Sequence, residues 1–224
     1  MHIIIKFLLL LSISFSLYSE SEIELSLNSD SIWRGITQNN GNATLSAEIN
    51  FALDNGFFSG ATFENCCDES TDYPNKEFGY MFGYQKDLNK TLNISINYLG
   101  TNYPDSKIDN FDEVEFNLSF KDLTISYFIG LDNFPDYYEI SYRYPFFNNS
   151  LSFSIGDFDS YSNDFNSNGL NYSLGVETLQ SNFKIKIYYY YLNANGKSDL
   201  DDDGIVLTIS KKLVFWIFVR FHKE

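Results

Sequence analysis

The stretch Thr44-Leu45-Ser46-Ala47-Glu48-Ile49-Asn50-Phe51-Ala52-Leu53, followed by Asp54-Asn55-Gly56, decides the fold class. Apolar and polar residues alternate along it, as expected for a β-strand whose two faces meet different surroundings. The Asp-Asn-Gly sequence that follows is typical of a hairpin turn, and a second strand-like segment returns over 57–63. These residues therefore predict a pair of antiparallel strands.

The same alternation recurs along the rest of the chain, and no segment has a helical apolar stripe. We predict twelve strands, at 22–27, 44–53, 57–63, 78–85, 92–98, 113–120, 123–130, 138–144, 151–156, 170–177, 183–191 and 205–209.

The connections between these strands alternate in length. The short ones are 54–56, 85–90, 121–122, 145–149 and 179–182, and the longer ones are 28–42, 65–76, 100–110, 132–136, 157–169 and 193–204. Of the second group only 132–136 is short. This alternation is typical of a membrane barrel with tight turns in the periplasm and loops outside. We therefore predict an all-β fold, a transmembrane antiparallel up-and-down β-barrel of the outer-membrane type. A secreted sandwich or a soluble barrel is the alternative.

The first residues resemble an export signal. Lys6 precedes an apolar run, and small residues follow near position 19, so we expect residues 1–19 to be a secretory signal peptide. An N-terminal membrane anchor is the alternative. The barrel is expected over 20–213, with an atypical C-terminal tail over 214–224. No other segment is long and apolar enough for a transmembrane helix.

The net charge of −15 limits the partners of this protein. An acidic surface disfavours nucleic acid, repels anions and enriches cations. We expect outer-membrane lipids, small solutes with cations favoured, and the barrel-assembly machinery as partners. We expect no cofactor.

Histidine is scarce, which argues against an enzyme. His2 lies in the expected signal peptide and His222 in the expected tail, so the barrel lacks the base of a serine hydrolase or a histidine-dependent protease. Carboxylate-only chemistry is the remaining enzymatic alternative.

Several charged residues alternate with apolar neighbours and are expected to face the lumen. They are Glu48, Glu113, Glu115, Glu139, Arg143, Lys184 and Lys186. Inward acids favour the passage of cations. The alternative is that these charges pair across the interior and fill it. The predicted function is passive diffusion of small solutes through a net acidic lumen. A non-conducting structural or adhesive barrel that acts through its external loops is the second hypothesis.

Two further patterns lie in expected loops. Asp199, Asp201 and Asp203 match the first half of a calcium-binding loop, but Ser210 stands where the bidentate glutamate would be. A solvated acidic loop is the simpler interpretation, and a weak divalent-cation site the alternative. Cys66 and Cys67 could form an adjacent-residue disulfide, stay as free thiols or link to another chain; two ligands are too few for a metal site.

One motif resembles a known family. Asp30-Ser31-Ile32-Trp33-Arg34-Gly35-Ile36-Thr37-Gln38, followed by Gly56-Phe57-Phe58-Ser59-Gly60, is similar to the Gcw-type conserved hypothetical proteins of proteobacteria, also described as TorF-family porins. The resemblance implies an outer-membrane-type barrel whose transported substrate is generally not established. Its motif residues are Asp30, Arg34, Gly35, Gln38, Gly56 and Gly60. The chain departs from the family pattern at Asn42, at 61–63 and beyond Leu213.

Arg34 has two interpretations within this motif. It could be a charge at the pore mouth or in the lumen that holds an anionic group. It could instead bond to nearby carboxylates such as Asp30, with Gly35 permitting a bend. We favour the structural interpretation.

Overall fold

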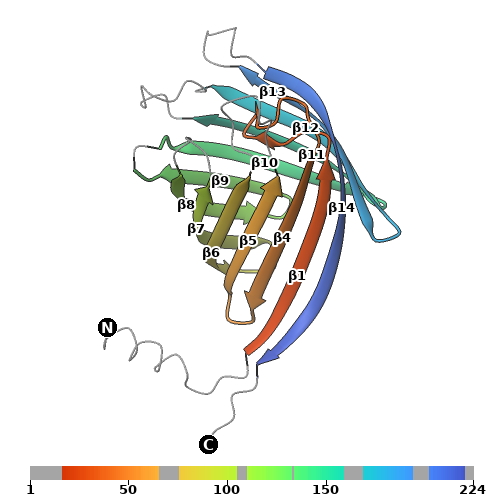
Figure 1. Ribbon diagram of the computed structural model, residues 1–224. Helices are drawn as coiled ribbons and strands as arrows, with labels where there is room; N and C mark the ends of the chain where they lie inside the picture. The colour runs from red at the N-terminus through yellow and green to blue at the C-terminus, as the bar shows by residue number, and fades with distance from the viewer. Residues whose placement is uncertain are drawn as a thin grey trace, which may run out of the picture.

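The computed structural model describes residues 17–65, 76–104, 110–132, 134–158, 169–193 and 202–219. Within these ranges the chain forms a closed barrel of antiparallel strands and one small separate hairpin (Figure 1). The predicted all-β barrel of twelve strands is confirmed. No helix in the described part of the chain is long and apolar enough to cross a membrane.

Each barrel strand pairs with its neighbours in sequence, and the first and last strands close the ring. The strands are β1 (Leu17–Asn28), β4 (Thr44–Leu53), β5 (Phe57–Asn65), β6 (Glu77–Asp87), β7 (Leu92–Asn102), β8 (Phe111–Phe120), β9 (Leu123–Gly130), β10 (Tyr137–Phe146), β11 (Asn149–Phe158), β12 (Leu170–Gln180), β13 (Phe183–Asn193) and β14 (Asp202–Val219).

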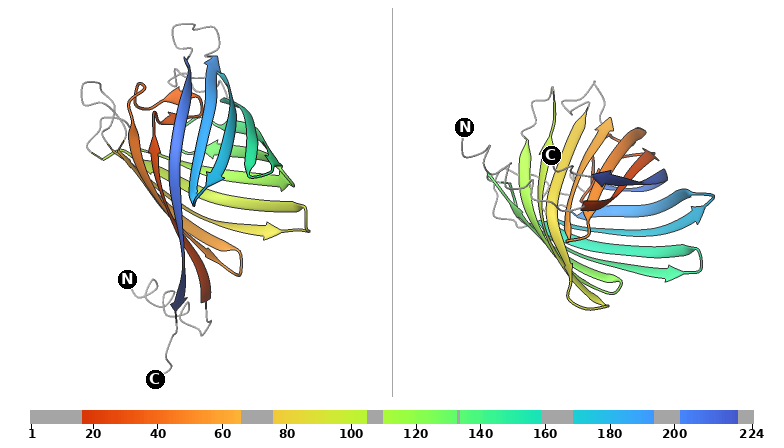
Figure 2. Two further views of the ribbon diagram at one scale, coloured as in Figure 1. Left: turned by 90° about the vertical axis from the view of Figure 1, so that its right-hand side faces the viewer. Right: turned by 90° about the horizontal axis from the view of Figure 1, so that it is seen from below.

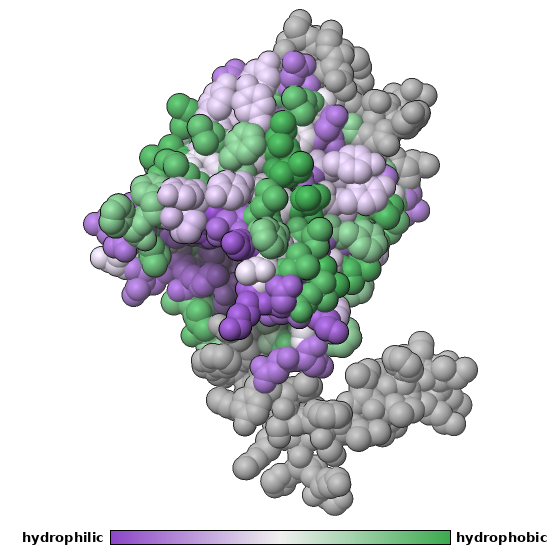
Figure 3. Space-filling model, turned by 180° about the vertical axis from the view of Figure 1, so that it is seen from behind, coloured by the Kyte–Doolittle hydropathy of each residue, from purple (hydrophilic) through white to green (hydrophobic). Residues whose placement is uncertain are grey.

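Alternation along the strands separates the two surfaces of the barrel. On β8, Phe116 and Leu118 are exposed on the outer surface, whereas Glu115 and Asn117 face inward. The same alternation places large exposed apolar side chains on every barrel strand, including Leu25 and Leu27 on β1, where Glu22 and Glu24 occupy the alternate positions. Figure 3 shows apolar side chains spread over the outer surface and hydrophilic ones gathered around a hollow at its lower left. The barrel is therefore apolar outside and polar inside.

The connections define two different ends of the barrel. The short-turn end carries the connections 54–56, 88–91, 121–122, 147–148 and 181–182. The long-loop end carries the connections that follow β1, β5, β7, β9, β11 and β13. The predicted alternation of short and long connections is thus present in the fold.

The strands β1 and β14 extend beyond their neighbours at the short-turn end (Figure 2). Residues 17–22 of β1 pair with residues 214–219 of β14. The last strand therefore does not end at Leu213, because β1 offers pairing partners as far as Val219. Likewise, β1 begins at Leu17, within the segment expected to be a signal peptide. Residues 1–16 and 220–224 lie outside the described residues.

The first long connection differs from the expected external loop. It forms a hairpin of β2 (Ile32–Trp33) and β3 (Ile36–Thr37) that turns into the barrel. We call residues 30–38 the inner hairpin. The most deeply buried apolar side chains lie on strands around it: Tyr137, Phe158, Tyr190, Leu192 and Val206. The apolar core thus forms where the inner hairpin meets the wall.

Candidate functional site

The tip of the inner hairpin is a tight turn at Arg34 and Gly35. Both have positive φ angles, of 50° and 83°. A Cβ atom on Gly35 would lie 2.8 Å from the Cβ of Asn171 on β12 and 3.3 Å from that of Leu192 on β13. Only glycine combines this backbone conformation with so close an approach to the wall. Gly35 therefore lets the tip rest directly on the inner wall.

Arg34 reaches from this tip to the wall at β8. Its two terminal nitrogens donate to the two carboxylate oxygens of Glu113, at 2.8 and 2.9 Å. The two side chains are only 8% and 4% exposed. A bidentate arginine–carboxylate pair is directional as well as charged, so it sets the orientation of the hairpin. Arg34 therefore bonds to a carboxylate, as the structural interpretation expected, but the partner is Glu113 on β8 and not Asp30.

Aromatic rings surround the Arg34 guanidinium. Its Cζ atom lies 4.7 Å from the ring centroid of Trp33, 4.4 Å from that of Phe128 and 4.2 Å from that of Tyr137. Cations over aromatic faces gain electrostatic attraction, most when water is excluded. The rings and Glu113 together compensate the burial of this charge.

Trp33 packs the same tip against three phenylalanine rings near the long-loop end. Its ring centroid lies 5.6 Å from that of Phe111 on β8, 5.9 Å from that of Phe134 and 5.6 Å from that of Phe158 on β11. Phe111 and Phe134 also stack on each other at 4.1 Å. The hairpin is thus held by packing on one side of the barrel.

Asp30 organises the base of the hairpin. Its carboxylate accepts from the backbone N–H of Ser31 at 2.8 Å and from the Thr37 hydroxyl at 2.9 Å. Burial raises the pKa of the Asp30 carboxyl, although these hydrogen bonds act in the opposite direction. The Gln38 backbone N–H donates to the Ser31 carbonyl at 2.7 Å. The Thr37 N–H donates to Asp202 on β14 at 3.1 Å.

The remaining family-motif glycines lie in the neighbouring strand pair. Gly56 stands in the turn between β4 and β5 with a φ angle of 94°, and Gly60 lies within β5. Gly60 faces the interior directly opposite Asn50 and Met81.

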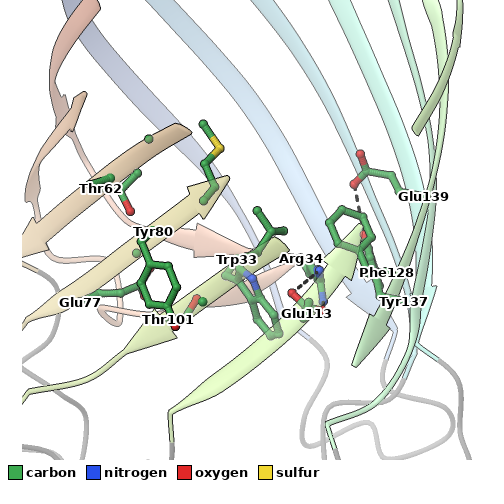
Figure 4. Close-up of a pocket in the computed structure, with 16 residues that line it drawn as sticks. Trp33, Arg34, Thr62, Glu77, Tyr80, Thr101, Glu113, Phe128, Tyr137 and Glu139 are labelled. Carbon is green, nitrogen blue, oxygen red and sulfur yellow. Dashed lines mark hydrogen bonds and ion pairs between the residues drawn. The ribbon is translucent and has the colours of Figure 1, made fainter. Parts of the chain in front are cut away.

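An upper cavity of about 350 Å³ lies beside the inner hairpin. Trp33, Arg34, Glu113 and Glu139 line one side of it, and β5 to β7 form the other (Figure 4). On that second side Thr62, Glu77 and Thr101 carry the polar groups, as Figure 4 shows. The hairpin therefore narrows the interior without filling it, and the space left follows the β5–β7 wall.

A lower cavity of about 280 Å³ lies toward the short-turn end. Its interior-facing residues come from β1, β4, β5 and β6 and include Glu22, Asn50, Phe58 and Gln85. Met81 lines both the lower and the upper cavity. The two spaces are thus adjacent along one wall.

Ion pairs line the short-turn half of the interior. Lys184 on β13 contacts Glu24 on β1 at 2.5 Å, and Lys212 on β14 contacts Glu22 at 2.9 Å. Arg143 on β10 pairs with Glu177 on β12 and also donates to Ser150 at 3.0 Å. The partners lie on adjacent strands or are separated by one strand, so these pairs run along the wall.

The other residues expected in the lumen have varied partners. Glu48 accepts from Asn50 at 2.5 Å, Glu115 from Asn97 at 2.5 Å, and Glu139 from the Tyr137 hydroxyl at 3.2 Å. Lys186 is in no ion pair among the described residues, and its Nζ atom lies 4.5 Å from the Tyr188 ring centroid. The structure thus gathers Glu113 and Glu139 at the hairpin and Arg143, Lys184 and Lys186 nearer the short-turn end.

Two further residues that shape this interior, Asp202 and Lys212, were not identified from the sequence. Their polar alternation on β14 was the available signal. It did not identify the partners, because those lie more than a hundred residues away in sequence.

The cysteine pair and the aspartate pattern, both expected in loops, contribute little to the described site. Cys66, Cys67, Asp199 and Asp201 lie outside the described residues. Asp203 lies on β14, where the Tyr189 hydroxyl approaches it at 3.4 Å. In the described ranges, no group of three histidine, cysteine, aspartate or glutamate side chains could hold a metal ion.

Comparison with known proteins identifies a family and a fold. A family model described as "Bacterial protein of unknown function (Gcw_chp)" matches residues 18–221. The fold is similar to a structure titled "KdgM porin", with a TM-score of 0.59 and 9% identity over 88% of this chain and 99% of that one. It is also similar to a structure of the NanC porin, with a TM-score of 0.57 and 11% identity over 85% of this chain and 100% of that one. No curated protein sequence matches the chain.

Proposed function

Because the chain belongs to the Gcw_chp family of bacterial proteins and folds as a porin-like barrel, we propose that it is an outer-membrane channel. It allows passive diffusion of small solutes, with cations favoured, and it performs no chemical reaction. The inner hairpin restricts the passage to one side of the barrel.

The outer surface supports the membrane location. Exposed apolar side chains cover the strands, and an antiparallel barrel satisfies its backbone hydrogen bonds internally. Tyrosines near the long-loop end have polar partners: Tyr80 donates to Asp112 at 3.1 Å and Tyr127 to Asp136 at 2.6 Å. Such amphipathic rings are typical of the boundary between membrane and water. The expected signal peptide would supply export.

The observation that carries the proposal is the pair of adjacent cavities along β4 to β7. Side chains in the short-turn half are also accessible to water, since Arg143 is 61% exposed and Lys212 is 47% exposed although both face inward. A filled interior would bury these charges. The arrangement therefore favours a hydrated path.

The balance of interior charges supports a preference for cations. The inward-facing acids include Glu22, Glu24, Asp30, Glu48, Glu64, Glu77, Glu113, Glu115, Glu139, Glu177 and Asp202. The inward-facing bases are Arg34, Arg143, Lys184, Lys186 and Lys212. Glu77 and Glu139, on the upper cavity, are in no ion pair among the described residues, so their charges act on solutes that enter.

A non-conducting barrel is the second candidate. The inner hairpin and its buried Arg34–Glu113 pair favour it, because they close part of the interior. In that case the barrel would be a structural or adhesive protein that acts through the loops of the long-loop end.

Single-channel conductance of the refolded protein in planar bilayers distinguishes the two candidates. A salt gradient across the bilayer reports ion preference through the reversal potential. The channel proposal expects discrete current steps and a cation-selective reversal potential. A barrel that is folded by circular dichroism but silent at every voltage would overturn it and favour the structural role.

A further inference from the structure

We propose that Met81 forms the constriction between the upper and lower cavities and thereby limits the size of the solutes that pass. This inference rests on the proposed channel function and names the residue that sets its size limit.

Met81 occupies the middle of a row of directly opposed residues that crosses the strands. The row runs Glu22, Asn50, Gly60, Met81, Leu99 and Glu113. Barrel strands are tilted, so a row perpendicular to them climbs along the barrel axis. Glu22, at one end, lines the lower cavity, and Glu113, at the other, lines the upper cavity. Met81 therefore lies at the level where one cavity passes into the other.

The contact between Met81 and Gly60 shows how close the packing is at this level. A Cβ atom on Gly60 would lie 2.8 Å from the Met81 Cε atom and would also overlap the side-chain oxygen of Asn50. Met81 thus lies against a stretch of wall that has no side chain of its own. Glycine at position 60 provides the room that the methionine occupies.

On the opposite side of the barrel, the inner hairpin occupies the interior. There the inner hairpin packs on β12 and β13 through Gly35, and Arg34 and Trp33 contact β8 and β11. Solutes that enter beside the hairpin consequently follow the β5–β7 wall past Met81. A methionine side chain is unbranched and flexible, so it can move aside for a small solute while resisting a larger one.

Thiol modification tests the position of Met81 directly. The protein would carry Met81→Cys in a background of Cys66→Ser and Cys67→Ser, and a positively charged methanethiosulfonate would be added during current recording. We expect at least about a twofold fall in current, because a bulky group then occupies the constriction. The matched control is Phe82→Cys in the same background, since Phe82 is 55% exposed on the outer surface of the same strand.

A size series tests the limit itself. In liposome swelling with neutral sugars of increasing size, Met81→Ala should admit larger sugars than the wild type, whereas Met81→Leu, of similar volume, should not. The inference would be overturned if the wild type conducts, modification of Met81→Cys leaves the current unchanged, and Met81→Ala admits no larger sugars than the wild type. The channel proposal would then still stand. A silent wild type would overturn both.

Discussion

Arg34 and Glu113 are 79 residues apart in sequence and form a bidentate ion pair inside the barrel. Arg34 belongs to a hairpin that follows the first strand, and Glu113 belongs to β8 on the wall. This pair holds the inner hairpin inside the barrel, although the same segment was expected to be an external loop. Because both side chains are buried, removing either one would leave an uncompensated buried charge and destabilise the folded state.

Glu113→Gln should both destabilise the barrel and enlarge the channel. Removing one partner of a buried ion pair costs about 3–5 kcal/mol when the other charge stays buried. The hairpin can avoid part of this cost by leaving the wall. We therefore expect a lower thermal unfolding temperature and a higher single-channel conductance. Glu115→Gln is the control, because Glu115 accepts from Asn97 and is in no ion pair within the described ranges. Equal conductance in both variants would contradict the role assigned to the pair.

Gly35→Ala should loosen the hairpin tip. The residue has a φ angle of 83°, and a Cβ atom would lie 2.8 Å from that of Asn171. Placing a non-glycine residue in this region costs of order 1–3 kcal/mol. We expect a lower unfolding temperature and noisier current, measured by circular dichroism and single-channel recording. Gly41→Ala is the matched control, since Gly41 also has a positive φ angle but no atom within 4 Å of its Cβ position. A Gly35 variant no less stable than the Gly41 variant would show that the contact with the wall is unimportant.

The double variant Glu77→Gln and Glu139→Gln should weaken cation preference. Each carboxylate contributes about 1 kcal/mol of attraction to a monovalent cation at contact distance in water. Neutralising both should shift the reversal potential toward zero in a salt gradient while leaving the unfolding temperature nearly unchanged. An unshifted reversal potential would mean that these groups do not face the conducted ions.

Lys184→Gln should change selectivity more than stability. The Lys184 side chain is 35% exposed and its partner Glu24 is 16% exposed. Ion pairs accessible to water contribute about 0–1 kcal/mol. We therefore expect little change in unfolding temperature, but a larger cation preference because Glu24 is released. Reversal potentials of the wild type and this variant, recorded at the same salt gradient, check the expectation. A fall in cation preference would contradict it.

Asp30→Asn should remove a pH dependence of stability. Burial raises the pKa of the Asp30 carboxyl, so the folded state binds this proton more tightly than the unfolded state. The contribution of this group to stability therefore increases as the pH falls from neutrality toward about 3.9, the pKa of an aspartate in the unfolded state. Comparing unfolding temperatures near neutrality and near that value, wild type against variant, isolates the contribution. An identical pH response in the two proteins would exclude it.

The strands could be predicted because their signal is local. Alternation over 44–53 and the turn at 54–56 require no knowledge of the rest of the chain, and the same holds for the other barrel strands. Strand ends depend on partners, which explains why β14 continues past Leu213 along β1. The motif around Arg34 was visible as a resemblance, but nothing near it in sequence indicated Glu113.

The sequence by itself determined the twelve alternating strands, the two classes of connection and the placement of polar side chains on one surface. Each of these follows from the period of a strand and the chemistry of a turn. Only the tertiary structure decided that residues 30–38 turn inward, that Arg34 meets Glu113, and that Met81 lies between two cavities. The physical reason is that closing the barrel brings distant strands together, and the contacts made inside it depend on that geometry rather than on neighbouring residues.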